Sequence, residues 1–206
     1  MRGKKVLVGS LLIVGLIWSF SSCGPTEETV ETGWILLDEE APVEAVEQAR
    51  DTADEFGSEL VSTLFRELED GNPLNAIYVC STKAQEMSAS YSEENLTIRR
   101  VSRRFRNPAD EPDAYELHRL GELQALHDRG KLPTESIQLI REDGTKSVRY
   151  MKPIVIKQPC LMCHGQVGEI DDAVLDSIHS QYPRDEAIGY EVGDLRGAIT
   201  VTVELQ

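Results

Sequence analysis

Apolar residues recur every three or four positions along two stretches of the N-terminal half of the chain. This spacing gathers apolar side chains in one stripe, so the first stretch predicts a long helix from Val43 to Leu68. The stripe consists of Val46, Ala49, Ala53, Phe56, Leu60, Leu64 and Leu68. Gly71 can end this helix, and Asn72 and Pro73 fit the N-cap and first residue of the next one.

The second stretch places a cysteine on an apolar face. Its repeating positions, again three or four residues apart, are Ile77, Cys80, Ala84 and Met87. Because Cys80 lies in this stripe, its side chain is predicted to point toward the core and not toward water.

Beyond residue 107 the pattern changes from long helices to short strands. The predicted elements are a helix over residues 112–130, strands over 136–141 and 147–156, a helix over 171–181 and a strand over 198–205. The inward positions of the first of these helices are Leu117, Leu120 and Leu123. Asp143-Gly144 between the first two strands indicates a hairpin turn. Helices followed by a small antiparallel sheet predict an α+β fold.

The chain begins with a segment that is typical of a secretory signal. Arg2, Lys4 and Lys5 precede an uncharged, mostly apolar run from Val6 to Phe20. This run is shorter than the about 20 residues that a membrane-spanning helix needs. We therefore expect residues 1–22 to be a signal peptide and the protein to be exported.

The segment Phe20-Ser21-Ser22-Cys23 resembles a bacterial lipobox, in which the cysteine becomes the lipidated first residue. On this interpretation, Cys23 holds the protein in the periplasm or at the outer face of a membrane. Residues 23–42 are then a polar tether and residues 43–206 one domain. The alternative is an ordinary signal peptide with an incidental cysteine.

The chain is acidic, with a formal net charge of −15 at pH 7. Removal of residues 1–22, which carry three basic and no acidic side chains, lowers the charge to about −18. Such a surface argues against nucleic acid as a partner and suits a basic redox partner.

The strongest chemical signal is Cys160-Leu161-Met162-Cys163-His164. Two cysteines at this spacing can each form a thioether bond with a vinyl group of haem, and the adjacent histidine can bind the iron. We therefore predict one covalent haem c, attached through Cys160 and Cys163, with His164 as an axial ligand. Attachment outside the cytoplasm agrees with the predicted export. The alternatives are a thioredoxin-like redox pair, a zinc site completed by Cys80, and a disulfide within the motif.

The second axial position of the iron decides between functions, and several side chains qualify for it. The candidates are Cys80, His118, His127, His179, Met87, Met151 and Met162. Met162 lies inside the attachment motif and cannot reach across the haem. Cys80 is favoured because it is predicted to face inward and, with the other cysteines assigned to haem and lipid, has no disulfide partner. Its alternative role is that of a small buried apolar side chain.

Several short segments together form a pattern found in one family. They are Ala76–Cys80, Arg106–Pro108 with Pro112-Asp113, Arg149–Ile154, Tyr182-Pro183, Gly189-Tyr190 and Gly193–Ala198. From about Ala45 to Val203, the chain resembles the bacterial PAS-like c-type haem domains. These occur alone or as the sensing part of signalling proteins, and include a cyanobacterial relative linked to photosystem II. The resemblance implies a PAS-like antiparallel sheet flanked by long N-terminal helices, and an iron held by His164 and Cys80.

Arginines gather within a short segment of this otherwise acidic chain. They are Arg99, Arg100, Arg103, Arg104 and Arg106. A guanidinium group suits the haem propionates because its fork geometry makes two hydrogen bonds to a carboxylate. Arg106 and Arg196, which lie in the family-like segments, are the preferred propionate partners. For any one arginine, the alternative is a place on a solvated, charged edge.

Two functions are consistent with these expectations. A thiolate ligand favours ferric iron, so release of Cys80 on reduction would make the protein a redox or small-ligand sensor. Because the chain ends at Gln206 without a kinase, cyclase or methyl-accepting module, we expect the signal to pass to an unidentified signalling or redox protein. The alternative is a periplasmic or membrane-tethered electron carrier. We do not expect an enzyme, since two strong ligands leave no position for a substrate. The helix over residues 43–68 offers a stripe for homodimerisation.

Overall fold

The computed structural model describes residues 33–69 and 73–206. The predicted signal peptide, the lipidation site Cys23 and the helix-end residues Gly71 and Asn72 lie outside these ranges. No helix within the described ranges is long and apolar enough to cross a membrane.

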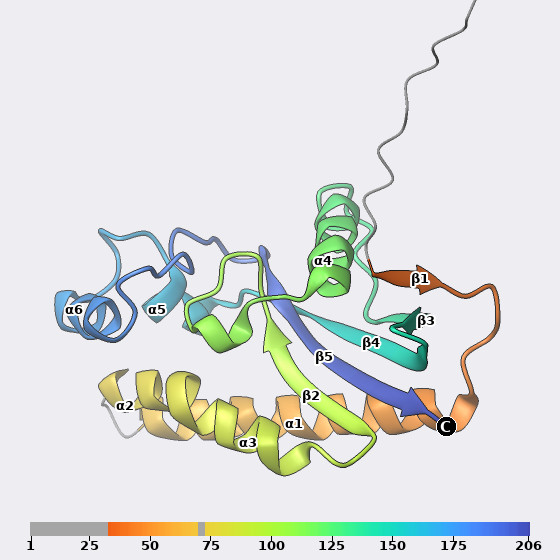
Figure 1. The fold of residues 1–206 in the computed structure, drawn as a ribbon. Coiled ribbons are helices and arrows are strands. Elements are labelled where there is room, and N and C mark those ends of the chain that lie inside the picture. Colours follow the sequence, from red (N-terminus) through yellow and green to blue (C-terminus); the bar gives the residue numbers. More distant parts are fainter. Residues whose placement is uncertain (1–32, 70–72) are drawn as a thin grey trace, which may run out of the picture. The chain divides into compact units, whose positions relative to one another are not determined.

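An antiparallel sheet of five strands forms the centre of the described residues (Figure 1), in the order β1-β3-β4-β5-β2. The strands are β1 (Trp34–Leu36), β2 (Leu96–Val101), β3 (Ser136–Glu142), β4 (Thr145–Val155) and β5 (Leu195–Leu205). Strands β3 and β4 form the predicted hairpin, and Asp143 and Gly144 take positive φ in its turn, as a tight two-residue connection requires.

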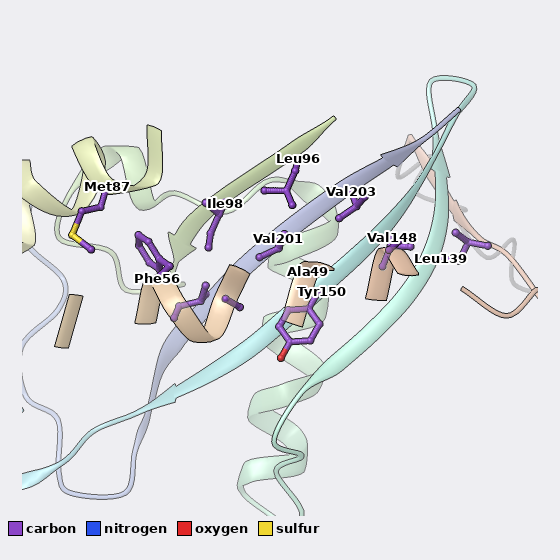
Figure 2. Close-up of a cluster of buried hydrophobic side chains, with 13 residues drawn as sticks. Ala49, Phe56, Met87, Leu96, Ile98, Leu139, Val148, Tyr150, Val201 and Val203 are labelled. Carbon is purple, nitrogen blue, oxygen red and sulfur yellow. The ribbon is translucent and has the colours of Figure 1, made fainter. Parts of the chain in front are cut away.

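Helix α1 (Val43–Glu69) lies along one face of the sheet (Figure 1). Of the first half of its predicted stripe, Ala49, Ala53 and Phe56 are buried and Val46 is partly buried, and Ala45, outside the stripe, is buried as well. In Figure 2, Ala49 and Phe56 lie among apolar side chains of β2, β4 and β5, together with Met87. The second half of the stripe lines a pocket beyond this core. The stripe that we considered for homodimerisation is therefore turned toward its own chain.

Helix α4 (Ala114–His127) covers the other face of the sheet. Its first turn is closed by a capping box. The Asp113 carboxylate accepts a hydrogen bond from the backbone N–H of Glu116, and the Glu116 carboxylate accepts one from that of Asp113. Leu120 and Leu123 pack into a second apolar cluster against the sheet, as predicted.

The prediction for Leu117 is wrong, because this side chain is 49% exposed. The buried face of α4 is centred on Tyr115, Glu116 and Leu123. At about 100° of rotation per residue, Leu117 lies roughly 120° away from the centre of that face. The spacing of the leucines therefore predicted a buried face that is rotated away from the observed one.

The second predicted helix is one helical segment with a wide turn in its middle. Its parts are α2 (Pro73–Tyr78), a π-helical turn η1 (Val79–Lys83) and α3 (Ala84–Tyr91). Pro73 is its first residue, as predicted. The backbone N–H of Ala84 donates to the carbonyl of Val79, five residues back, which defines the wide turn. Cys80 lies within it.

The remaining short elements are η2 (Pro108–Asp110), η3 (Gln158–Cys160), α5 (Leu161–His164) and α6 (Asp172–Gln181). Helix α6 packs on α2 through Ile77, Val174 and Ile178, and α2, α5 and α6 lie together at one end of the sheet (Figure 1). The predicted α+β class is confirmed. One boundary is corrected, because residues 34–36 of the expected tether pair with β3 and Trp34 packs edge-on against Tyr115, with ring centroids 5.2 Å apart.

Candidate functional site

A large pocket continues from the core on the α1 side of the sheet. Its space, including the part open to solvent, is about 1340 Å³. The apolar part of its wall includes Leu60, Val61, Leu64, Leu68, Ile154, Ile156 and Ile199. Gly57 permits the close approach of α1 to the sheet, since a Cβ there would lie 3.0 Å from Cδ1 of Ile199. A wall of this kind suits a large, mostly apolar ligand.

The predicted haem-attachment motif forms part of this wall. Its pocket-lining residues are Cys160, Met162, Cys163 and His164. Backbone hydrogen bonds from Gly189 to Gly165 (2.7 Å) and from Tyr190 to His164 (2.9 Å) join the motif to the loop before β5. The two thiols are also packed separately: Cys160 contacts a small cluster with Ile156 and Tyr190, and Cys163 one with α2 and α6. The motif is therefore held rigidly at the pocket.

The hydrogen bonding of His164 leaves one ring nitrogen suited to a metal. Its Nδ1 lies 2.6 Å from the carbonyl oxygen of Ala187. A carbonyl only accepts, so Nδ1 carries the proton and Nε2 keeps its lone pair. Burial lowers the pKa of His164 well below its usual range, and the charges of Arg196 and Arg106 lower it further. The imidazole is therefore neutral, which is the form that binds iron.

Cys80 reaches the same pocket from a different helix. It is half-buried, and it lies in the π-helical turn between α2 and α3. Wide turns of this type interrupt the regular helix and are frequent at functional sites. The structure thus brings Cys80 and His164, which lie 84 positions apart in the sequence, to one pocket.

The other candidate axial ligands lie elsewhere, apart from Met162. Met87 and Met151 are buried in the two cores on opposite faces of the sheet. His118 and His179 are exposed on α4 and α6, and His127 contacts the carbonyl of Gly193 through Nε2 (2.7 Å). Among the described candidates, Cys80 and Met162 line the pocket.

Strand alternation divides the arginine cluster between the two faces of the sheet. Leu96 and Ile98 point to the α1 side, and Arg100, two residues on, lines the pocket. Arg99 points to the opposite side and pairs with the buried carboxylate of Glu116 on α4. Arg103 and Arg104 follow the end of β2 and line a separate, smaller pocket.

Arg100 is bound to the turn that carries Cys80. Its Nη2 donates to the carbonyl oxygen of Cys80 (2.9 Å) and lies 3.3 Å from Oδ2 of Asp110. The other oxygen of Asp110 accepts from Nε2 of Gln85 at 2.9 Å. Arg100 and Asp110 therefore connect the π-helical turn to α3 and to the segment that follows β2.

Arg106 is bound to the attachment motif. Its Nη2 donates to the carbonyl oxygens of Cys163 (2.6 Å) and Ala187 (3.2 Å). The same nitrogen lies 3.0 Å from Oδ2 of Asp185, whose side chain is 1% exposed. Arg106 lines the pocket, as expected of a propionate partner, but most of its hydrogen-bonding capacity is directed to the backbone around His164.

Arg196, the second expected propionate partner, also lines the pocket. Its Nη1 donates to Oγ of Ser102 (2.6 Å) and to the carbonyl oxygen of Arg104 (3.0 Å). Burial lowers the pKa of Arg196, and the charges of Arg106 and Arg100 act in the same direction. Three guanidinium groups at one apolar pocket favour a ligand that carries negative charge.

The donor set fits haem better than a metal ion bound directly by protein. Cys80, Cys160 and Cys163 are free thiols, and burial raises the pKa of Cys163 to about 11. Within the described ranges, no three His, Cys, Asp or Glu side chains lie close enough together to hold one ion, so the four residues of the zinc alternative do not converge. The buried Nε atoms of Arg100 and Arg106 also find no acceptor there. A haem with two propionates requires an apolar wall, ligands for the iron and for attachment that lie apart from one another, and guanidinium groups with free N–H donors. This pocket offers all three.

Sequence reasoning missed three parts of this site. The stripe of Leu96 and Ile98 could have assigned Arg100 to the pocket, because it continues their alternation. The partner of Arg106, Asp185, carries no local signal, since the two lie on different loops. The wide turn at Cys80 is also invisible in the spacing, which fits an ordinary α-helix equally well.

Comparison with known proteins supports this description of the fold. A model of the Tll0287-like family (Tll0287) matches residues 38–204. No curated protein was found to match the chain. Among solved structures, the chain is similar to the crystal structure of the cyanobacterial haem protein Tll0287, with a TM-score of 0.58 and 24% identity over 81% of this chain and 98% of that one. This similarity confirms the predicted PAS-like arrangement of a five-stranded antiparallel sheet with a long N-terminal helix. Because the family model covers most of the chain, the protein is a member of the Tll0287-like family.

Proposed function

We propose that this protein binds one haem c and acts as a redox or small-ligand sensor outside the cytoplasm. The observation that carries the proposal is the meeting of the attachment motif and Cys80 at a single apolar pocket. The haem protein Tll0287, which has the same fold, makes haem the natural occupant of such a pocket. When bound, haem would supply an iron that changes its charge by one electron and that is held by protein side chains.

The attachment motif provides three of the proposed contacts. Cys160 and Cys163 would hold the haem covalently, each through a thioether bond to one of its vinyl groups. His164 presents Nε2 to the iron, and the Ala187 carbonyl fixes the ring through Nδ1. Arg106 has a positioning role, because it holds the carbonyls on either side of His164.

Cys80 is the proposed switch. Cys80 would hold the iron as a thiolate, and whether Sγ takes up a proton would depend on the charge of the iron. The π-helical turn and the Arg100–Asp110 pair hold Cys80, so its release is transmitted to α3 through Gln85.

Electron transfer is the second candidate function, and the exposure of the motif favours it. Met162, within the motif, is 46% exposed, and Val167 just after it is 52% exposed. An apolar surface beside the cofactor, on a chain with a formal charge of −15, suits brief contact with a basic redox protein.

Further parts of the proposal concern the location and the partners. We place the protein in the periplasm or on a membrane face, anchored through Cys23, with an unidentified signalling or redox protein as its partner and no nucleic acid. Two protein ligands on the iron leave no position for a substrate, so the proposal does not include an enzymatic turnover.

The replacement Cys80→Ala in the haem-loaded, full-length protein tests the ligand assignment. We expect a changed ferric absorption spectrum and a midpoint potential higher by at least about 100 mV, since axial ligands alone span about 0.8 V. Met162→Leu, at the other candidate ligand that lines the pocket, is the matched control and should leave both unchanged. An unchanged spectrum in Cys80→Ala would refute the sensor mechanism.

Further measurements distinguish the sensor from the electron carrier and test the haem assignment itself. Binding of carbon monoxide to the reduced protein favours the sensor, because a coordination position must open. Rapid, salt-sensitive reduction by a basic protein without such binding favours the carrier. If protein made with the c-type maturation machinery gives no pyridine haemochrome spectrum, the assignment of haem c itself fails.

A further inference from the structure

A second, smaller pocket lies on the α4 side of the segments that follow β2 and precede β5. Its space, including the part open to solvent, is about 600 Å³. Arg103, Arg104 and Arg196 contribute to its wall, together with Tyr190 and, from α4, Leu120. Neither the haem-attachment residues nor Cys80 line it, so it is separate from the larger pocket.

The positive charge at this pocket is not neutralised by neighbouring carboxylates. Six arginines elsewhere in the described residues lie within 4.0 Å of a carboxylate: Arg50, Arg99, Arg100, Arg106, Arg119 and Arg149. Arg103, Arg104 and Arg196 have no such carboxylate among the described residues. The one acid on the wall, Asp194, already accepts a hydrogen bond from the backbone N–H of Glu191 at 2.8 Å. The pocket therefore has a net positive charge in a chain whose total is −15.

Two of the three guanidinium groups are held in place by the protein. Arg104 donates to the carbonyl oxygens of Glu186 and Ile188, and its guanidinium lies 4.2 Å from the centre of the Tyr190 ring. Arg196 donates to Ser102 and to the carbonyl of Arg104. Fixed donors lose little entropy when an anion binds between them.

Arg103 completes the arrangement as an arm without a partner. Its side chain is exposed at the pocket, and no hydrogen bond or ion pair joins it to any described residue. Because its guanidinium group is exposed and unpaired, it is available to make charge-assisted hydrogen bonds with an anion bound beside the two fixed groups.

This pocket is also connected to the predicted iron ligand. Ser102, Arg196 and Gly197 line both pockets, so the two adjoin each other. The Tyr190 ring, stacked on Arg104, meets the His164 ring edge-on, with centroids 6.3 Å apart. A negative charge bound among these arginines would reduce the positive potential at His164.

We propose that this second pocket binds a carboxylate group. A carboxylate matches the guanidinium fork in shape and charge, and the Tyr190 and Leu120 side chains accommodate a short apolar chain behind it. The carboxylate belongs either to a haem propionate that passes Arg196 or to a small free organic acid. The propionate source and the effect on the iron rest on the proposed haem function, whereas binding of a free acid to the protein without haem does not.

Titration with succinate tests the site in full-length protein, with and without haem, by calorimetry. Chloride at matched ionic strength shows the effect of salt alone. In Arg103→Gln, we expect the dissociation constant for succinate to rise at least about tenfold, because one charge-assisted contact is lost. Arg129→Gln, an exposed arginine at the end of α4 that does not line the pocket, is the matched control and should bind as the parent does.

The haem-loaded protein distinguishes the two sources of the carboxylate. If a propionate fills the pocket, succinate binds only the haem-free protein, and Arg103→Gln shifts the midpoint potential without added acid. If a free acid is the ligand, succinate binds both forms and shifts the potential of the parent but not of Arg103→Gln. Succinate that binds no better than chloride in either form, or equal loss in Arg103→Gln and Arg129→Gln, overturns the proposal. A protein that takes up no haem but binds succinate refutes the proposed function and leaves this site intact.

Discussion

At the scale of single residues, the site depends on a buried ion pair that touches the backbone around His164. The side chains of Arg106 and Asp185 are 8% and 1% exposed, and Oδ1 of Asp185 also accepts from the backbone N–H of Ala187 at 2.8 Å. The Ala187 carbonyl fixes the His164 ring. The ion pair therefore positions a proposed iron ligand indirectly, through the backbone of Ala187. Breaking such a pair on one side is costly because the other charge stays buried.

Replacement of Arg106 by methionine should therefore lower the free energy of unfolding by about 3–5 kcal/mol. In the double variant Arg106→Met/Asp185→Asn, no uncompensated charge remains, and much of this loss should be recovered. Urea unfolding of the haem-free protein measures both. If Arg106→Met is as stable as the parent, the Asp185 carboxylate must become hydrated when Arg106 is absent.

Gly197 is a second residue whose identity is dictated by its surroundings. A Cβ at this position would lie 2.2 Å from the backbone oxygen of Val101. Gly197→Ala should cost about 2 kcal/mol or more, because strand β5 must move away from β2. Gly168→Ala, where nothing lies within 4 Å of the added carbon, should change stability by less than about 0.5 kcal/mol. Equal effects in chemical denaturation would contradict this explanation.

Residues that follow a local chemical rule were predictable, and residues paired across the fold were not. The attachment motif and Cys80 follow from spacing, and the structure brings all of them to one pocket. The contacts of Arg106 depend on a loop about 80 positions away, so the residues around Arg106 in the sequence do not predict them. Its expected role as a propionate partner rested on the chemistry of the guanidinium group and on its place in a family-like segment.

At the scale of elements, helix α1 uses one continuous stripe for two purposes. Up to Phe56 the stripe packs on the sheet, and from Leu60 onward it lines the pocket. The periodicity predicted the helix and its inward face correctly, but it treated both halves as core. No pattern along a helix indicates where its neighbour stops, because that depends on the length of the strands packed against it. The short strand β1 was missed for a related reason, since only three residues form it and its pairing is with distant β3.

The two phenylalanines of α1 test this division. Phe56 is completely buried and Phe65 is 39% exposed. Phe56→Ala should lower the free energy of unfolding by about 3–5 kcal/mol, and Phe65→Ala by less than about 1 kcal/mol. Thermal or urea unfolding of the haem-free protein gives both values. Similar losses would show that the second half of α1 packs as tightly as the first.

A salt bridge between α1 and the start of β3 predicts a dependence on pH. Two hydrogen bonds from Arg50, both 2.8 Å long, hold the pKa of Glu135 below its usual value of 4.5, with burial opposing and Tyr150 assisting. The lowered pKa stabilises the fold above pH 4.5, and this stabilisation is lost as the pH falls through the pKa of the folded state. Because both side chains are partly exposed, the contribution is under about 1 kcal/mol.

The variant Glu135→Gln should accordingly be less stable than the parent at pH 7, and the difference should shrink as the pH falls below 4.5. Unfolding free energies of the parent and the variant, measured between pH 7 and pH 3, show whether the difference in stability decreases. A difference that persists unchanged at low pH would show that Glu135 acts through packing and not through its charge.

At the scale of the whole molecule, an acidic exterior surrounds a site whose local charge is positive. The formal charge of the chain is −15, yet Arg100, Arg106 and Arg196 line the larger pocket. At a distance, the acidic protein therefore attracts partners that carry basic groups. Inside the pocket the potential is positive, so a negatively charged ligand is attracted there.

This arrangement predicts how the haem-loaded protein reacts with small one-electron reductants. Of two reductants with similar potentials, the cationic one should react about tenfold faster at low ionic strength, and the ratio should fall toward one near 0.5 M salt. Stopped-flow reduction measures the ratio. A ratio that does not depend on salt would mean that the positive pocket, and not the exterior, controls the approach.

The alternation of arginines along β2 has a consequence for how the gene can change. Arg99 serves the α4 side and Arg100 the pocket side, so adjacent residues belong to unrelated networks. Loss or gain of a single codon within β2 would exchange the two faces of the strand. It would remove one of the two arginine partners of Glu116 and the support of Cys80 in one event, although either arginine could be substituted alone. Length in this strand is therefore more strongly constrained than the identity of any one of its side chains.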